Sequence, residues 1–122
     1  MSSLTARRRA YVAVQVTLTT ADTPYRLLDL INTVLAEESG MASPPMVCPD
    51  ACGHLILQTD SSSTGPILIG DGLISTSRYG YQIAKSAAQS YTSGNLNVIQ
   101  LGSMYVQSHT MGDKLNVEVM TY

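Results

Sequence analysis

The sequence predicts a mainly β protein, a sandwich or barrel of short strands with one helix. Stretches in which apolar and polar residues alternate recur along the chain, and turn residues separate them. A single segment repeats its apolar residues at helical spacing. Charged residues make up only 13% of the chain and apolar residues 44%, so uncharged polar residues fill many of the other positions. This composition is typical of a β-rich protein whose surface is easily desolvated.

The first two regular segments are a strand and the helix. From residue 11 to residue 19 apolar and polar residues alternate, which predicts a strand with one buried face. In the next segment the apolar residues recur at spacings of three and four, which predicts a helix at about residues 24–38. Thr23 can cap this helix, Pro24 suits its first position and Gly40 can end it. Its apolar face consists of Leu27, Leu28, Ile31, Val34 and Leu35.

After a loop rich in Pro and Gly, the chain consists of short strands with turns between them. The predicted strands are HLILQT (54–59), PILIG (66–70), LISTS (73–77), RYGYQIAK (78–85), SGNLNVIQLG (93–102), SMYVQSH (103–109) and KLNVEVMTY (114–122). Turns are predicted at 71–72 and 111–113. Because no linker divides the chain, we expect a flexible basic arm at residues 1–9 and a single domain at residues 10–122.

The charge balance limits the classes of partner. The formal net charge of −2 gives no reason to expect nucleic-acid binding. Arg7, Arg8 and Arg9 form the one basic cluster. This cluster is a disordered terminus, a grip on nucleic acid, or an arm that pairs with acidic groups of a neighbouring subunit. No stretch approaches the roughly 20 apolar residues of a membrane span, and no secretory signal is evident. We therefore expect a soluble protein made in a reducing compartment, with no membrane partner.

Cys48, Cys52 and His54 are the candidate metal ligands. Zinc would need a fourth ligand, and His109 lies far away in the sequence. A redox pair normally has two residues between its cysteines and starts a helix, whereas this pair has three and lies in a Pro-rich loop. A disulfide would close only a small loop. The interpretation that we favour is two half-buried thiols that anchor the loop, with no metal and no cofactor.

The sequence does not predict an enzyme. It contains no Gly-x-Ser-x-Gly motif. Asp60 and Asp71 could form a carboxylate pair, but turn formation explains both, because each stands where a predicted strand ends.

The segment from Leu55 to the C-terminus resembles a small β-sandwich module of tailed-bacteriophage virions. The matching parts are the loop that ends in Gly65-Pro66, then "ILIGD", "GYQIAKSAAQSY" and "NLNVIQLGS", and a last strand after Gly112. Residues 82–88 depart from the usual turn of such modules. The resemblance implies a jelly-roll-like antiparallel β-sandwich with one helix near residues 24–38. It also implies a capsid cement or decoration protein without catalytic residues.

We therefore expect a protein that binds the major capsid protein on the outside of a phage head, as a dimer or trimer assembled in the host cytoplasm. The candidate contact residues are Arg7, Arg8, Arg9, Tyr11, Tyr25 and Tyr122, although the tyrosines could equally pack the rims of the core. One alternative is a tail or fibre protein that binds a host glycan, which the absence of Trp and Phe disfavours. Another is a small metal-binding protein built on the Cys48, Cys52 and His54 group.

Overall fold

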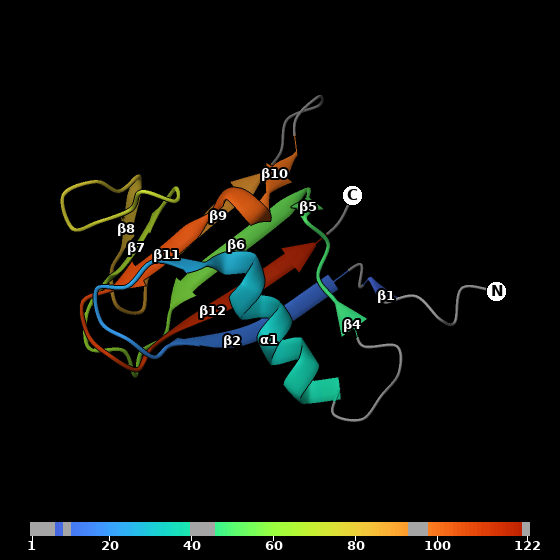
Figure 1. The fold of residues 1–122 in the computed structure, drawn as a ribbon, viewed down its shortest axis with the longest axis horizontal. Helices are drawn as coiled ribbons and strands as arrows, with labels where there is room; N and C mark the ends of the chain where they lie inside the picture. The colour runs from blue at the N-terminus through green and yellow to red at the C-terminus, as the bar shows by residue number, and fades with distance from the viewer. Residues whose placement is uncertain (1–6, 9–10, 40–45, 93–97, 121–122) are drawn as a thin grey trace.

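The structure is a computed structural model, and it describes residues 7–8, 11–39, 46–92 and 98–120. The elements are β1 (Arg7–Arg8), β2 (Tyr11–Leu18), β3 (Tyr25–Arg26), α1 (Leu27–Ser39), β4 (Met46–Val47), β5 (Ala51–Cys52), β6 (His54–Thr59), β7 (Ile67–Gly70), β8 (Tyr81–Ile83), β9 (Ala88–Thr92), β10 (Ile99–Gln100), the 3-10 helix η1 (Leu101–Ser103), β11 (Tyr105–Ser108) and β12 (Asp113–Met120). Figure 1 shows their arrangement.

The described part contains two four-stranded sheets, in the orders β2-β12-β6-β9 and β3-β11-β7-β8, and two small two-stranded sheets, β1-β4 and β10-β5. The antiparallel pairs are nested along the chain: β2 pairs with β12, β3 with β11, β6 with β9, and β7 with β8. A chain that rolls up in this way, with its outer strands paired to each other and its inner strands paired to each other, is a jelly roll. The predicted mainly β sandwich with one helix is confirmed.

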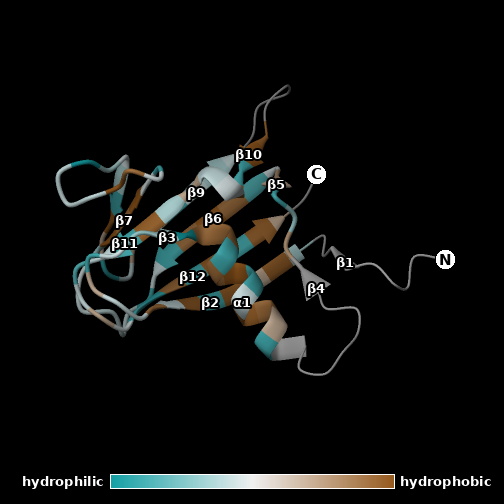
Figure 2. Cartoon of the chain, viewed as in Figure 1, coloured by the Kyte–Doolittle hydropathy of each residue, from teal (hydrophilic) through white to brown (hydrophobic). Residues whose placement is uncertain are grey.

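The core lies between the two sheets, because alternate residues of each strand point inward. In β2 and β12 the burial alternates over the full length, as the period of two predicts. Figure 2 shows the apolar residues concentrated along β2, β12, β6 and α1. The buried inward residues of the first sheet are Val12, Val14, Val16, Leu18, Leu55, Leu57, Leu115, Val117 and Val119.

The helix α1 completes the core beside the short strand β3. Figure 1 shows α1 lying across β2 and β12. Its inward residues Leu27, Leu28, Ile31 and Leu35 are buried in the same cluster as the residues of both sheets. Because each fully buried Leu or Ile side chain contributes about 1.5–3 kcal/mol, burial of this face holds the helix in place.

The predicted start of the helix is wrong by three residues. Tyr25 and Arg26 form β3, because they pair with Val106 and Tyr105 of β11. The backbone N–H of Leu27 then donates to the carbonyl of Met104 at 2.9 Å. Pro24 and Thr23 therefore precede a strand and not the helix, so tertiary pairing overrides the local capping signal.

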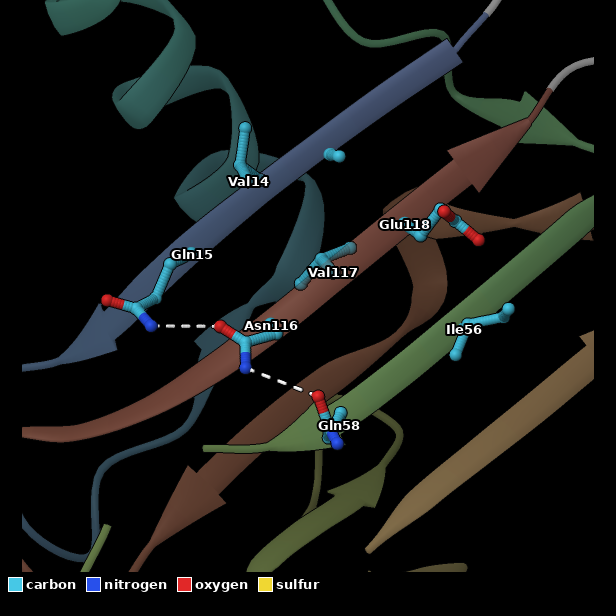
Figure 3. Close-up of a pocket in the computed structure, with 8 residues that line it drawn as sticks. Val14, Gln15, Ile56, Gln58, Asn116, Val117 and Glu118 are labelled. Carbon is cyan, nitrogen blue, oxygen red and sulfur yellow. Dashed lines mark hydrogen bonds between the residues drawn. The ribbon is translucent and has the colours of Figure 1, made fainter. Parts of the chain in front are cut away.

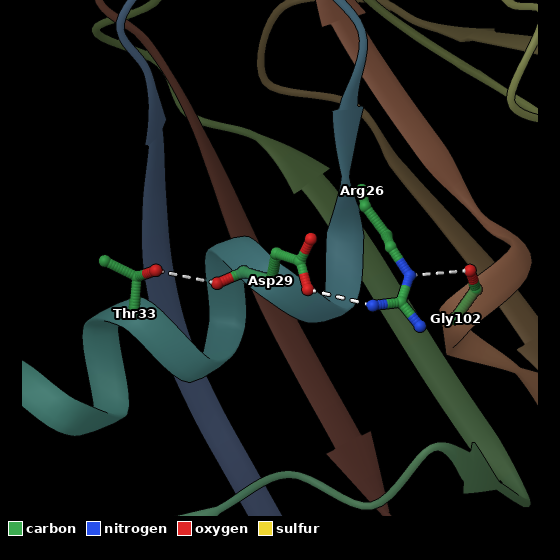
Figure 4. Close-up of polar contacts among 4 residues, drawn as sticks. All are labelled: Arg26, Asp29, Thr33 and Gly102. Atoms are coloured by element: carbon green, nitrogen blue, oxygen red, sulfur yellow. Dashed lines mark hydrogen bonds and ion pairs between the residues drawn. The ribbon is translucent and has the colours of Figure 1, made fainter.

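Arg26 fixes the junction between β3 and α1. Its Nε donates to the carbonyl of Gly102 in η1 at 2.9 Å, and its guanidinium pairs with Asp29 in the first turn of α1, also at 2.9 Å. Figure 4 shows both contacts together with the bond from the Thr33 hydroxyl to the Asp29 carbonyl. One side chain thus joins the helix, the strand and η1.

Three strand predictions need correction. Residues 73–77 are a turn and not a strand, because the segment folds back on itself through a bridge between Ser75 and Arg78. The strand β9 was not predicted, because its residues are mostly small and polar and show no apolar alternation. Of the strand predicted at 93–102, residues 93–97 lie outside the described part, Ile99–Gln100 form the short strand β10, and Leu101 begins η1.

The N-terminal segment is described only at Arg7–Arg8. These two residues form β1, which pairs in parallel with β4. The flexible arm at residues 1–9 and the single domain at residues 10–122 stay predictions. No helix among the described residues is long and apolar enough to cross a membrane.

Candidate functional site

The outer face of the sheet β2-β12-β6-β9 is the candidate functional site. Strand register places Gln15, Asn116 and Gln58 side by side in one row across β2, β12 and β6. The next row holds Ala13, Glu118 and Ile56. These residues alternate with the core residues of the same strands, so their side chains point away from the core.

Hydrogen bonds fix the orientation of the amides in the first row. Gln15 Nε2 donates to Asn116 Oδ1 at 2.9 Å, and Asn116 Nδ2 donates to Gln58 Oε1 at 3.5 Å (Figure 3). Asp60, just beyond the end of β6, accepts from both neighbours: Asn116 Nδ2 donates to its Oδ1 at 3.0 Å and Gln15 Nε2 at 3.3 Å. The carboxylate therefore orders a row of uncharged groups.

Asp60 is held in its ionised form. The hydroxyl of Ser62 donates to its Oδ2, and this bond, followed by the bond from Asn116, lowers the pKa of Asp60 to about 2. The backbone N–H of Ser62 donates to the same oxygen at 3.0 Å. The sequence-based expectation that Asp60 serves the turn after β6 agrees with these contacts, and the structure adds its role in ordering Gln15 and Asn116.

Tyr11 lies on the same face and contacts the second row. Its hydroxyl donates to Glu118 Oε2 at 2.6 Å, while 52% of the residue remains exposed. The bond to Glu118, more than burial, raises the pKa of Tyr11 above its ordinary value. Of the predicted contact residues whose side chains the structure describes, Tyr11 and Tyr25, Tyr11 therefore lies on this face.

A hollow of about 440 Å³ lies over the two rows. Figure 3 shows its lining side chains on β2, β12 and β6. Glu118 is the one ionisable residue among those that line it. The lining residues are Ala13, Val14, Gln15, Ile56, Gln58, Asn116, Val117 and Glu118. Sequence reasoning missed this site because the alternation shows which residues point outward, but not which strands are neighbours.

The end of the sandwich at β7 and β8 carries a second exposed cluster. Leu73, which is 72% exposed, and Tyr79 lie in the connection between these strands, and Tyr81, the first residue of β8, is also exposed. The connection is well bonded: Asp71 accepts from the Leu73 N–H at 2.9 Å and pairs with Arg78 at 2.7 Å. We call Leu73, Tyr79 and Tyr81 the β7–β8 cluster.

Cys48 and Cys52 are free, buried thiols. Burial, aided by the negative charge of a neighbouring Cys52 thiolate, raises the pKa of Cys48 to about 12. The Cys48 N–H donates to Asn32 of α1 at 2.8 Å, which ties the loop to the helix.

His54, the third candidate metal ligand, is half-buried and pairs in register with Met120 and Thr92. Among the described residues no three His, Cys, Asp or Glu side chains are grouped as metal ligands.

The other predicted contact residues divide into three cases. Tyr25 packs against the core, and its hydroxyl bonds with the Thr19 hydroxyl at 3.0 Å and accepts from the Thr20 N–H at 3.1 Å. Its contacts are therefore those of a core-rim residue. Arg7 and Arg8 are described only as the backbone of β1. Arg9 and Tyr122 lie outside the described residues.

Comparison with known proteins finds no family and one similar solved structure. No family model matches the sequence, and no curated protein matches it. Among solved structures, the chain is similar to one from the work "Bacillus endospore appendages form a novel family of disulfide-linked pili", with 14% identity and a TM-score of 0.46 over 92% of this chain and 86% of that chain.

Proposed function

We propose that the chain is a structural protein of a phage virion, a cement or decoration protein that binds the outside of the capsid shell. It acts as a dimer or trimer that bridges neighbouring subunits of the major capsid protein. The proposal includes no catalytic activity, no cofactor and no nucleic-acid or membrane partner. Binding energy gained on the assembled shell adds to the stability of the shell by mass action.

The observation that carries this proposal is the β7–β8 cluster. Three large side chains that are all exposed within one short segment, residues 73–81, are typical of protein contact sites. The turn behind them is fixed by the contacts of Asp71 with Leu73 and Arg78. The Gly80 N–H also donates to the Ile69 carbonyl at 2.7 Å, which ties the end of the connection back to β7. A connection that is already ordered loses little conformational entropy when it binds a shell.

The positions of the candidate contacts suit a bridge. β7 and β8 lie at one end of the long axis in Figure 1, and β1, which contains Arg7 and Arg8, lies at the other. A protein that joins two neighbours needs contact groups at separated places. We assign the β7–β8 cluster to one neighbour, and the basic residues Arg7, Arg8 and Arg9 to acidic groups of the other.

Co-sedimentation with empty heads of the phage that encodes the chain tests the proposal. Wild-type protein should pellet with the shells, and Leu73→Ser should lower its affinity at least about tenfold, the equivalent of about 1.4 kcal/mol. Met111→Ser is a matched control, because Met111 is also 72% exposed but lies in the turn between β11 and β12. Protein that stays in the supernatant, or equal losses for both variants, would contradict the proposal.

A further inference from the structure

We propose that the hollow on the outer face of the sheet β2-β12-β6-β9 binds a neutral sugar unit of a glycan. This site is separate from the β7–β8 cluster, so the inference stands or falls independently of the cement function. It goes beyond the sequence, in which the lack of Trp and Phe argues against a glycan partner. The groups that carry it are a row of side-chain amides, an aliphatic floor and a tyrosine ring.

Unused hydrogen-bonding groups remain in the row. Within the described part of the chain, Gln15 uses only its Nε2 group and Gln58 uses only its Oε1. One amide acceptor and one amide donor are therefore available to a ligand, together with Oε1 of Glu118, whose Oε2 is engaged by Tyr11. A sugar hydroxyl both donates and accepts, so fixed partners of both kinds suit it.

The order of the row makes these groups ready for binding. Asn116 donates to Asp60 and Gln58 and accepts from Gln15, so neither neighbouring amide has to be reoriented when a ligand arrives. Because the amides are already held, a ligand that bonds to them loses less free energy to side-chain ordering. The same bonds determine which end of each amide remains for the ligand.

The charge around the hollow selects against acidic ligands. Its lining contains the carboxylate of Glu118 and no cationic side chain. The carboxylate of Asp60 lies beside the row and is ionised, since its pKa is about 2. Lys114 stands on the same face in the row next to Asn116 and helps to lower the pKa of Asp60, but it does not line the hollow. Phosphate, nucleic acid and sialylated or uronic glycans would therefore meet like charge from the lining itself. An uncharged ligand with many hydroxyls meets no such repulsion.

Apolar groups lie next to the polar ones, as the C–H surface of a sugar ring requires. Ile56 and Ala13 belong to the row adjacent to Gln58 and Gln15 and line the hollow. The half-exposed ring of Tyr11 stands beside them, held by its bond to Glu118. The volume of about 440 Å³ is in the range of small-ligand sites. A pyranose that rests on the aliphatic side chains can place its hydroxyls against the amides.

The experiment is a glycan array probed with the full-length chain. The array should hold neutral hexoses, N-acetylhexosamines and deoxyhexoses beside sialylated and uronic glycans. The best-binding sugar is then titrated into ¹⁵N-labelled protein. We expect binding to neutral glycans, with saturable shifts of the signals of Ala13, Gln15, Ile56, Gln58 and Asn116.

Two matched variants locate the site. Gln58→Ala should weaken sugar binding about tenfold, the usual effect of one lost hydrogen bond. Gln82→Ala removes an exposed glutamine of β8, in the other sheet, and should leave sugar binding unchanged.

Four results would overturn the inference: no neutral glycan binds the array, acidic glycans bind better, the shifts lie elsewhere, or both variants bind equally well. If Gln58→Ala instead releases the protein from phage shells without affecting any sugar, the hollow is a protein contact and the glycan assignment is wrong.

Discussion

The two faces of the sheet β2-β12-β6-β9 are built from alternate residues of the same strands, yet they differ in kind. Toward the core the strands present mainly Val and Leu side chains, which are buried, with Thr, Gln and Tyr side chains and one buried carboxylate, that of Asp113. Toward solvent, β2, β12 and β6 present amides, the carboxylate of Glu118, the side chains of Lys114 and His54, and a few apolar groups that are only partly covered. Both faces share the same backbone ladder. The comparison teaches that one strand can hold the fold with one set of alternate residues and present the other set to solvent, where a ligand can reach it.

Substituting two adjacent residues of β6, one on each face of the sheet, is the strongest test of the difference between the faces. Leu57 is fully buried, whereas Ile56 lies on the outer face. Leu57→Ala should lower the free energy of unfolding by about 2–5 kcal/mol, because it leaves a cavity in the core. Ile56→Ala should lower it by less than half of that, because no cavity forms. Urea denaturation of both variants measures the difference, and equal losses would show that the two faces are not distinct.

The reactivity of the two buried thiols tests whether the core, to which both belong, is closed to reagents. At pH 8 a thiol reagent should modify Cys48 and Cys52 at least about a hundredfold more slowly in native protein than in denaturant. The reason is that both thiols are buried and that burial raises the pKa of each. Rapid modification of either thiol in the native protein would contradict the closed arrangement.

We expect the stability of the protein to depend modestly on pH because of Asp60, which lies beside the outer face. Its pKa is lowered from 3.8 to about 2 in the folded protein, so the unfolded chain binds more protons between these values. Its contribution to stability is therefore complete above about pH 4 and is lost as the pH falls through about 2. Asp60→Asn should make stability less dependent on pH in this window. Unfolding curves at pH 5, 4, 3 and 2 measure the effect, and identical slopes for both proteins would exclude it.

The smallest expected effect concerns Tyr11. The difference between ultraviolet titrations of wild type and Tyr11→Phe gives the titration of this tyrosine alone. Its midpoint should lie above the ordinary pKa of 10.0, because the phenol donates to Glu118. Glu118→Gln should move the midpoint back toward that value. A midpoint at or below 10.0 in the wild type would mean that the bond does not persist in solution.

Much of the fold is predictable from the sequence, because alternation and turn residues act locally. The strand at 54–59 was predicted with the bounds that it has, and the strand predicted at 103–109 lies at 105–108. The inward face of Leu115, Val117 and Val119 follows from the period of two. The turn at Asp71 was also predicted from its residues, and its side chain does accept from the Leu73 N–H. The secondary-structure predictions that failed concern residues whose conformation depends on pairing with strands far away in the sequence. Tyr25 and Arg26 are extended only because β11 pairs with them.

The candidate site was less predictable than the fold. Gln15, Gln58 and Asn116 each occupy an outward position that the alternation identifies, but their meeting depends on the register of three strands far apart in the sequence. The exposed position of Leu73 was missed because residues 73–77 were expected to be a strand, whereas they form a turn. Local patterns thus give the direction of a side chain and not its neighbours.

The measurement that tests the central claim most directly is the thermal stability of empty phage shells with and without the chain. A cement protein binds the intact shell in preference to its separated subunits, so saturating wild-type protein should raise the temperature at which the shells fall apart. Leu73→Ser should lose this effect at the same concentration, and Met111→Ser should keep it. An unchanged transition temperature in the presence of saturating wild-type protein would contradict the proposed function.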